Sequence, residues 1–350
     1  MKKPTVMRAL KKATQQAKPA GNNGYLLKQL KPQNLILYAD KSVVAINKPR
    51  GLVCQPSRPI TSPPVEENDE DLMSVALRGI REALFMEEDL RVVHRLDKQT
   101  SGFLLLARTH AAARDIARQM QDRSMQKTYL ALVCGEAADF PSTSGTMDTQ
   151  LICENGRIRV ADGPYHQPSQ VSSSNLPGEN WVKQAITEYR VLASSPTAPI
   201  SLLELNLVTG LKHQIRAQLA QQLGTPILGD IYGPSEQTQE IARMLDLRRI
   251  ATLCLHSSRL TYTRYARTGP LKKFRLGLGA PIPSGFDAVC KAARIELDID
   301  QRSGGVWLDN SKVRGVGSED YQHQRGINEK GGIDDAVTEI GGVWYGDRDQ

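Results

Sequence analysis

Runs of apolar residues bounded by polar turns recur along the chain and predict β-strands. The first two runs are separated by Asp40-Lys41, a dipeptide typical of a hairpin turn. The predicted strands cover residues 34–39, 43–47, 103–107, 127–134, 186–192 and 201–208, with further strand-like segments near 251–263. Together they indicate an extensive sheet.

Helical spacing of apolar residues predicts helices over 72–84, 110–123 and 212–223. Because the strands come in runs with only occasional helices, the predicted fold class is α+β, a mixed, mostly antiparallel central sheet with flanking helices. The third helix would have two faces with different roles. Its apolar face carries Ile215, Leu219 and Leu223, and its other face carries His213, Arg216 and Ala220.

Segments of biased composition suggest how the chain is divided. Residues 56–71, with several prolines and an acidic run, predict an exposed loop, and residues 140–183, rich in Ser, Pro and Gly, predict an irregular insertion. After about residue 300 the chain becomes Gly-rich and polar, and Gly-Gly-Val-Trp occurs twice, which is too few copies for a repeat fold. The predicted parts are a basic leader over 1–31, a catalytic domain over 32–295 and a largely disordered tail over 296–350.

Charge adds an expectation about the partner. A formal net charge of +7 and a pI near 9.1 favour a polyanion, and with only 5% aromatic residues, contacts to nucleic acid should rest on backbone charge. The first 39 residues hold eight bases and no acid, which is typical of a mitochondrial transit peptide. A disordered basic arm that adds RNA affinity is the alternative, and the protein would then be cytoplasmic or nuclear.

Other classes of protein are disfavoured. The five cysteines are far apart and never form C-x-x-C, so neither a zinc site nor a disulfide framework is indicated. No apolar run approaches the roughly 18 residues that a membrane span needs. A soluble intracellular protein is expected.

The candidate chemistry centres on the stretch VHRLDKQTSGFLLLA, residues 93–107. It places Asp97 among His94, Arg95 and Lys98 in a turn before an apolar strand, where neighbouring positive charge favours an ionised carboxylate. An ionised, positioned carboxylate can act as a nucleophile. A surface turn with incidental ion pairs fits the local chemistry at least as well.

The pattern His-Arg-Leu-Asp-Lys-x-Thr-Ser-Gly followed by an aliphatic strand resembles the central motif of RluA-family pseudouridine synthases. Further segments resemble other motifs of that family, in the same order, and the resemblance spans about 34–290. These segments are Lys-Pro-x-Gly at 48–51, Lys-Thr-Tyr-Leu-Ala at 127–131, Thr-Gly-Leu-Lys-His-Gln-Ile-Arg at 209–216, Gly-Asp at 229–230, Tyr-Gly at 232–233 and Leu-His-Ser at 255–257.

The resemblance implies an isomerase that converts uridine in RNA to pseudouridine without a cofactor or metal. By the same resemblance, Asp97 is the nucleophile, Tyr129 lies against the uracil and Arg216 pairs with Asp97. The expected partner is structured RNA, ribosomal first and transfer RNA second, with no membrane and no obligate protein partner. Candidate RNA or substrate contacts are Lys48, His94, Arg95, Lys98, Lys127, Lys212, His213 and Gln214.

Two alternatives keep parts of this interpretation. One is a non-catalytic RNA-binding assembly factor on the same scaffold, and the other is a glycosylase that releases the base. Leu211-Lys212 also departs from the family's usual Arg-Thr, so the fork geometry that suits a bidentate phosphate contact is missing. His94 and His213 lack ligand-like neighbours at metal spacing, which favours hydrogen-bonding roles for both.

Overall fold

The computed structural model describes residues 26, 28–54, 72–161, 180–248, 250, 252–265, 272–313, 337 and 340–346. The predicted acidic loop at 56–71 and most of the basic leader lie outside these residues. No described helix is long and apolar enough to cross a membrane.

The described strands form one branched, mostly antiparallel sheet, which runs β14-β1-β2-β4-β10-β5-β9-β8-β6-β7. Strands β11, β12 and β13 branch from β10, and β3 pairs with β4. The predicted α+β class is confirmed. The bounds are β1 Ile36–Ala39, β2 Val43–Lys48, β3 Arg91–Val92, β4 Ser101–Ala107, β5 Gln126–Cys134, β6 Ser144–Glu154, β7 Arg157–Val160, β8 Trp181–Ser194, β9 Ile200–Leu207, β10 Leu255–Tyr265, β11 Lys273–Gly279, β12 Gly305–Leu308, β13 Ser311–Lys312 and β14 Val343–Trp344.

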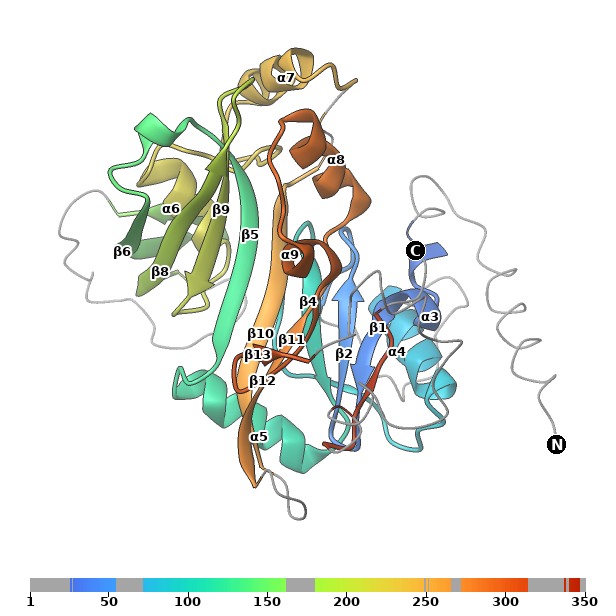
Figure 1. Ribbon diagram of the computed structural model, residues 1–350. Coiled ribbons are helices and arrows are strands. Elements are labelled where there is room, and N and C mark those ends of the chain that lie inside the picture. The colour runs from blue at the N-terminus through green and yellow to red at the C-terminus, as the bar shows by residue number, and fades with distance from the viewer. Residues whose placement is uncertain are drawn as a thin grey trace, which may run out of the picture.

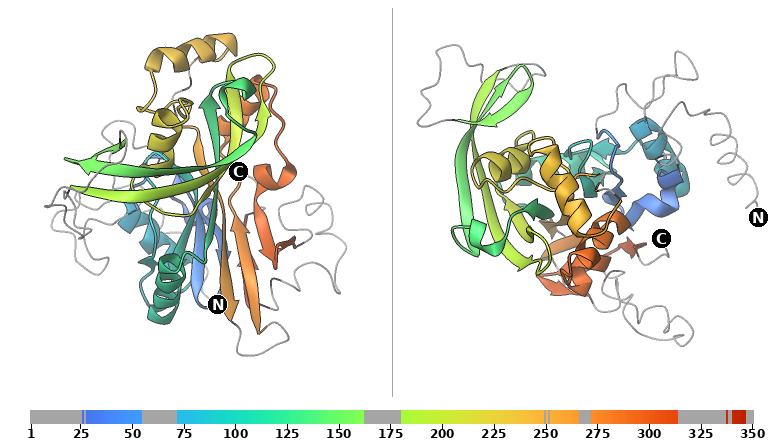
Figure 2. Two further views of the ribbon diagram at one scale, coloured as in Figure 1. Left: turned by 90° about the vertical axis from the view of Figure 1, so that its left-hand side faces the viewer. Right: turned by 90° about the horizontal axis from the view of Figure 1, so that it is seen from above.

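Helices flank the sheet at both ends, with α3 and α4 beside β1 and β2, and α6 beside β6, β8 and β9 (Figure 1). The helix α6 lies inside the curve of the long strands β6 and β8 (Figure 2), where the Gln218 amide donates to carbonyls of both strands. The helix bounds are α3 Pro32–Leu35, α4 Leu72–Ala83, α5 His110–Gln121, the 3₁₀ turn Ala137–Asp139, α6 Gln214–Gln221, α7 Ser235–Met244, α8 Ser284–Ala292 and α9 Ile299–Ser303.

Alternation along the central strands produces a core on each face of the sheet. In β4, Leu104 and Leu106 face one core together with Leu77 of α4, whereas Phe103 faces the other core with Ile116 of α5. Because β4 is covered on both faces, all seven of its residues are buried. This explains the uninterrupted apolar run in the sequence.

The sheet branches at β10, and the branch aligns the predicted motifs. The first part of β10 pairs in parallel with β4, so that Ser257 lies opposite Gly102, while the later part pairs with β11. On its other side Ser257 lies opposite Tyr129 of β5. The start of β4 and the motif tyrosine are therefore held in one row across three strands.

Gly102 makes the close approach of β4 and β10 possible. Its φ is +110°, and a Cβ placed there would lie 2.2 Å from the Ser257 carbonyl oxygen. A side chain would meet backbone that cannot move aside without breaking the row.

Two predictions from composition were wrong for the residues that the structure describes. Much of the expected irregular insertion at 140–183 forms β6, β7 and the start of β8, because polar residues suit strands with an exposed face. The expected disordered tail is ordered at 299–313 and 340–346: β12 pairs with β11, and β14 pairs with β1. Strand β11 was not predicted.

Both Gly-Gly-Val-Trp segments add a strand to the sheet, each at a different place, and their glycines explain how. A Cβ on Gly304 would lie 2.5 Å from the Gly279 carbonyl oxygen, and one on Gly342 would lie 2.3 Å from the Tyr38 hydroxyl oxygen. The absence of side chains at these positions lets the added strands pack closely. Composition alone could not separate this use of glycine from disorder.

We predict that Gly102→Ala lowers the free energy of unfolding by at least about 2 kcal/mol, because the new methyl group meets both a disfavoured φ and the Ser257 carbonyl. Denaturant unfolding would measure the change. Gly285→Ala is the matched control, since nothing lies within 4 Å of a Cβ at that helical position, and it should alter stability by less than about 1 kcal/mol. Equal effects at the two sites would contradict the packing argument.

Candidate active site

Asp97 lies on the loop between β3 and β4, and polar contacts fix this loop on both sides of it. The Cys54 thiol accepts the Leu96 N–H at 3.2 Å and donates to the Leu96 carbonyl at 3.3 Å. The Lys98 carbonyl accepts the Gly51 N–H at 2.7 Å. The early Lys-Pro-x-Gly segment thus supports the loop that carries Asp97.

Lys48 of that segment is buried rather than presented to RNA. Its ammonium donates to the carbonyls of Pro49, Leu52 and Lys98 at 3.1, 2.9 and 3.3 Å. Burial lowers the pKa of Lys48 to about 8, although the nearby Cys54 and Asp97 act to raise it. The prediction of an RNA contact from Lys48 is wrong for this structure, because a fully buried ammonium cannot reach a phosphate.

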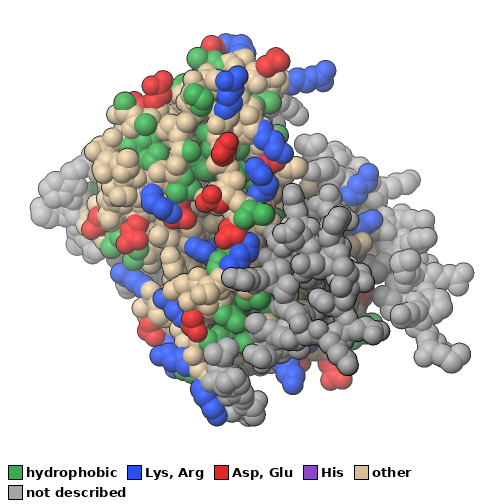
Figure 3. Space-filling model, viewed as in Figure 1, with side chains coloured by type: hydrophobic (Ala, Val, Ile, Leu, Met, Phe, Trp, Pro, Cys, Tyr) green, Lys and Arg blue, Asp and Glu red, His purple; other side chains and the backbone are tan. Residues whose placement is uncertain are grey.

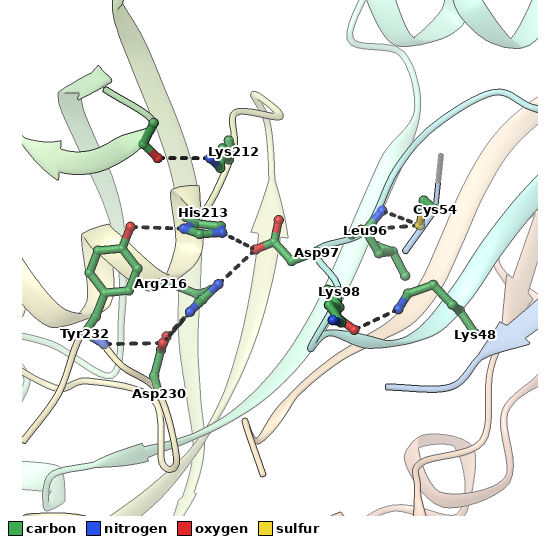
Figure 4. A network of polar contacts seen from close by, with 11 residues as sticks. Lys48, Cys54, Leu96, Asp97, Lys98, Lys212, His213, Arg216, Asp230 and Tyr232 are labelled. Atoms are coloured by element: carbon green, nitrogen blue, oxygen red, sulfur yellow. Dashed lines mark hydrogen bonds and ion pairs between the residues drawn. The ribbon is translucent and has the colours of Figure 1, made fainter. Parts of the chain in front are cut away.

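Arg216 of α6 connects two carboxylates (Figure 4). Its Nε and Nη2 donate to Asp230, at 2.9 Å to Oδ2 and 2.6 Å to Oδ1, while its Nη1 lies 3.4 Å from Oδ2 of Asp97. The Asp230 side chain is fully buried, and that of Asp97 is 18% exposed. Asp230 is therefore the buried partner of Arg216, whereas the Asp97 carboxylate remains accessible to a ligand.

His213 and Tyr232 complete this cluster. His213 Nδ1 lies 3.1 Å from the Tyr232 hydroxyl oxygen, and its Nε2 lies 3.8 Å from Oδ2 of Asp97. The Arg216 guanidinium lies 5.3 Å from the Tyr232 ring centroid, within the range of a cation–π interaction. The histidine thus lies next to the open carboxylate, whereas sequence placed it only on the same helix face as Arg216.

Tyr129 is buried in the row that also holds Ser257, which lies opposite it on β10. Burial, with the negative charge of Asp97 as a second cause, raises the pKa of Tyr129 well above its ordinary value. The phenol is therefore protonated at neutral pH. Of the predicted trio, Asp97 of the loop and Arg216 of α6 are in contact, and Tyr129 of β5 lies near enough for the charge of Asp97 to raise its pKa.

His94 and Gln214 are structural groups. His94 Nε2 accepts the Leu105 N–H at 2.8 Å, and burial lowers the pKa of His94 to about 4, so that the ring is neutral. The Gln214 amide accepts from Thr209 and the Leu211 backbone and donates to Thr187 and the Ile186 carbonyl. With the Gln214 amide so occupied and its residue 2% exposed, the predicted RNA contact is wrong. His94 likewise faces backbone and not the site.

The remaining predicted contacts lie nearer to solvent. Arg95 and Lys98 are exposed, Lys127 is half-buried, and burial lowers the pKa of Lys127. Lys212 is exposed, and its ammonium donates to the Gly156 carbonyl, at the turn between β6 and β7, at 2.9 Å. These four cations remain candidates for phosphate contacts.

The departure at Leu211-Lys212 has a structural explanation. Leu211 packs against an apolar cluster that includes Leu151 and Ile158 of the β6–β7 hairpin. Lys212 holds the turn of the same hairpin. The pair therefore joins the third motif to the hairpin, a role that does not require a guanidinium fork.

Charge on the described part of the face in Figure 3 is of both signs, with Lys and Arg side chains lying among Asp and Glu. No group of three or more potential metal ligands occurs among the described His, Cys, Asp and Glu residues. The candidate site is the polar cluster around Asp97, because there a partly exposed carboxylate lies beside Arg216 and His213.

A family model described as RNA pseudouridylate synthase matches residues 42–221. This range covers more than half of the chain and includes Asp97, Tyr129 and Arg216. The chain belongs to the RNA pseudouridylate synthase family. It is an RNA pseudouridine synthase, which confirms the enzyme class predicted from the motifs.

Individual relatives agree with this family. The mitochondrial pseudouridylate synthase RPUSD4 of Xenopus tropicalis is 30% identical over 290 residues, covering 77% of this chain and 82% of the relative. The ribosomal large subunit pseudouridine synthase D of Borreliella burgdorferi is 33% identical and covers 66% of this chain and 62% of its own. The dual-specificity synthase RluA of Yersinia pestis is 32% identical, over 61% of this chain and 88% of its own, in agreement with the RluA-type motifs.

A solved structure of a pseudouridylate synthase has a similar fold. The solved structure of human RNA pseudouridylate synthase domain containing 4 is similar with a TM-score of 0.57 and 26% identity, covering 78% of this chain and 99% of that one. The branched sheet of the synthase is therefore the fold of its family.

Sequence analysis gave no role to two residues of the synthase site, Asp230 and Tyr232. Both lie beyond the range of the family match, within the Gly-Asp and Tyr-Gly segments. The available signal was a lone carboxylate two residues after the apolar pair 227–228, where burial would require a charged partner. Sequence could not identify that partner as Arg216.

We predict that Asp230→Ala lowers the free energy of unfolding of the synthase by about 3–5 kcal/mol, because it leaves the buried Arg216 without its main partner. Chemical denaturation would measure this. The control is Glu204→Ala, which removes the partner of Arg190, a side chain 60% exposed, and should cost less than about 1 kcal/mol. A loss at Asp230 no larger than at Glu204 would show that burial adds nothing to the pair.

Proposed function

We propose that Asp97 is the catalytic carboxylate of the synthase and that Arg216 orients it. The proposal rests on the different ways in which two carboxylates contact the Arg216 guanidinium. Asp230 takes two donors of the guanidinium and is fully buried, whereas Asp97 receives a single longer contact and is partly exposed. The more accessible carboxylate is the one that can meet a substrate.

The reaction needs such a group. The bond between uracil N1 and the sugar C1′ breaks, the bound base turns, and a new bond joins C5 to C1′, after which C5 loses its proton and N1 ends protonated. A carboxylate can assist by attacking C1′, as in retaining glycosidases, or by promoting a glycal-like intermediate. Both routes require the carboxylate to be held in one orientation, which a charge-assisted contact from Arg216 provides.

Tyr129 completes the proposed trio by packing against the uracil. It is buried, and its elevated pKa keeps the phenol neutral, so the ring offers an apolar surface with one hydroxyl. Its alignment with Gly102 through Ser257 fixes its position relative to the Asp97 loop. Because the reacting atoms are shielded in stacked RNA, the uridine would be flipped into the site.

Structured RNA is the proposed substrate, ribosomal RNA first and transfer RNA second, in mitochondria. A relative named for the ribosomal large subunit supports ribosomal RNA, and another named as a dual-specificity RNA pseudouridine synthase supports more than one kind of RNA target. A relative named as mitochondrial and the acid-free basic stretch of the first 39 residues support the compartment. Arg95, Lys98, Lys127 and Lys212 are the proposed phosphate contacts.

We predict that Asp97→Asn abolishes pseudouridine formation while RNA affinity stays within about threefold, because the shape is kept and only the nucleophile is lost. Product analysis of a reacted RNA, together with a binding titration, would test this. Asp122→Asn is the control, since Asp122 is an exposed aspartate at the end of α5. An active Asp97→Asn enzyme would contradict the proposed role.

The same assay distinguishes other functions. Free uracil in the product mixture would indicate a glycosylase. Tight RNA binding by the wild-type protein without any product would favour an assembly factor.

For the substrate and compartment, we predict that loss of the gene removes pseudouridine from a site in mitochondrial ribosomal RNA. Pseudouridine mapping of mitochondrial and cytosolic RNA, in cells with and without the gene, would detect it. Restoration by the wild-type gene but not by Asp97→Asn is the control. A change confined to transfer RNA or to cytosolic RNA would refute the corresponding part of the proposal.

A further inference from the structure

His213 lies between a tyrosine hydroxyl and the proposed catalytic carboxylate, in an arrangement that sequence motifs did not suggest (Figure 4). Its Nδ1 faces the Tyr232 hydroxyl at 3.1 Å, and its Nε2 faces Oδ2 of Asp97 at 3.8 Å. The two rings meet edge to face, with centroids 5.8 Å apart and an interplanar angle of 90°. Each ring nitrogen of His213 therefore faces a different polar side chain.

The acceptor beside Nε2 indicates which nitrogen of His213 carries the proton. A neutral imidazole has a single N–H, and a carboxylate oxygen can only accept a hydrogen bond from it. Because Oδ2 of Asp97 faces Nε2, the favoured tautomer carries its proton on Nε2. Nδ1 is then the acceptor and the Tyr232 hydroxyl is the donor.

The backbone of His213 shows that its position is imposed by the surroundings. Its φ and ψ are +53° and +19°, in the left-handed region, which a residue other than glycine adopts at a cost of about 1–3 kcal/mol. The contacts of Gln214 and Lys212 hold the chain on either side of it. This backbone directs the imidazole toward Asp97.

Both contacts to the carboxylate of Asp97 meet at one oxygen. Arg216 Nη1 and His213 Nε2 each face Oδ2 of Asp97. The other donors of the guanidinium, Nε and Nη2, are taken by Asp230. Among the contacts described for the Asp97 side chain, both are therefore made to Oδ2. Oδ1 is left for the ligand.

We propose that His213 is a positioning residue: Tyr232 holds it as the Nε2–H tautomer, and it helps Arg216 to hold Oδ2 of Asp97, so that Oδ1 is presented to the uridine. This inference rests on the proposed role of Asp97. The separation of 3.8 Å is too long for a hydrogen bond, and the contact shortens when substrate fills the site. Because Tyr232 also packs against the apolar cluster that contains Ile158, the chain of contacts connects the β6–β7 hairpin to Asp97.

The tautomer can be measured without RNA. In full-length protein labelled with 15N-histidine, the protonated and unprotonated nitrogens of a neutral imidazole give separate NMR signals, and His213→Asn identifies which signals belong to His213. We expect Nε2–H in the wild-type protein and a mixture of tautomers in Tyr232→Phe. A wild-type His213 protonated on Nδ1 would overturn the proposal.

Kinetics test the consequence. Tyr232→Phe should lower kcat by between about tenfold and a hundredfold with KM changed by less than about twofold, because orientation and not binding is lost. The control is Tyr265→Phe, at an exposed tyrosine on β10. An unchanged kcat in Tyr232→Phe would overturn the proposal.

Two substitutions at His213 separate positioning from a merely structural role. Asparagine tolerates the left-handed backbone well but is too short to reach Asp97, whereas glutamine places an amide N–H near the position of Nε2. We expect His213→Gln to retain at least about tenfold more kcat than His213→Asn. The reverse order would show that the backbone alone matters and would overturn the proposal. The same changes at exposed His110 serve as controls.

The outcomes for Asp97 and His213 can be told apart. If Asp97→Asn remains active, the proposed function fails whatever the tautomer of His213. If Asp97→Asn is inactive but His213→Asn and Tyr232→Phe match the wild type, only the positioning role fails. Circular dichroism and thermal unfolding of each variant would confirm that the comparison is between folded proteins.

Discussion

The buried ion pair between Arg216 and Asp230 is the interaction on which the polar site depends. A guanidinium taken out of water must be paired, and the bidentate contact of Asp230 satisfies that need without using Asp97. Because Nε and Nη2 are held, the direction of Nη1 is fixed as well. The position of a buried carboxylate thus decides how a second, more exposed carboxylate is oriented.

A backbone constraint supplies the other half of the site. The close approach of β4 and β10 at Gly102 and Ser257 aligns the Asp97 loop with Tyr129. Lys48 and Cys54 hold the loop by hydrogen bonds to its backbone carbonyls. These contacts are made largely to backbone atoms, which explains how short, separated motifs can specify one geometry. The loop is therefore held by hydrogen bonds on both sides of Asp97.

Three histidines near the motifs show how environment decides the role of one residue type. Burial lowers the pKa values of His94 and His256 to about 4, and each bonds to structural groups, His94 to a backbone N–H and His256 to Ser101 and the Ala280 carbonyl. Only His213, of these three, faces a carboxylate and a phenol. Its left-handed backbone turns it there, and spacing along the chain does not reveal such a conformation.

The sequence by itself determined the α+β class and the enzyme family, and it singled out Asp97, Tyr129 and Arg216 as candidates, because apolar periodicity and unbroken motifs are local properties of the chain. It failed where the answer depended on contacts between distant segments. Tertiary structure alone decided whether Lys48 lay inside or outside and which partner Asp230 had. It also decided whether the Gly-Gly-Val-Trp segments were disordered or paired with other strands of the sheet. Burial and pairing are properties of the assembled sheet, and no single segment contains them.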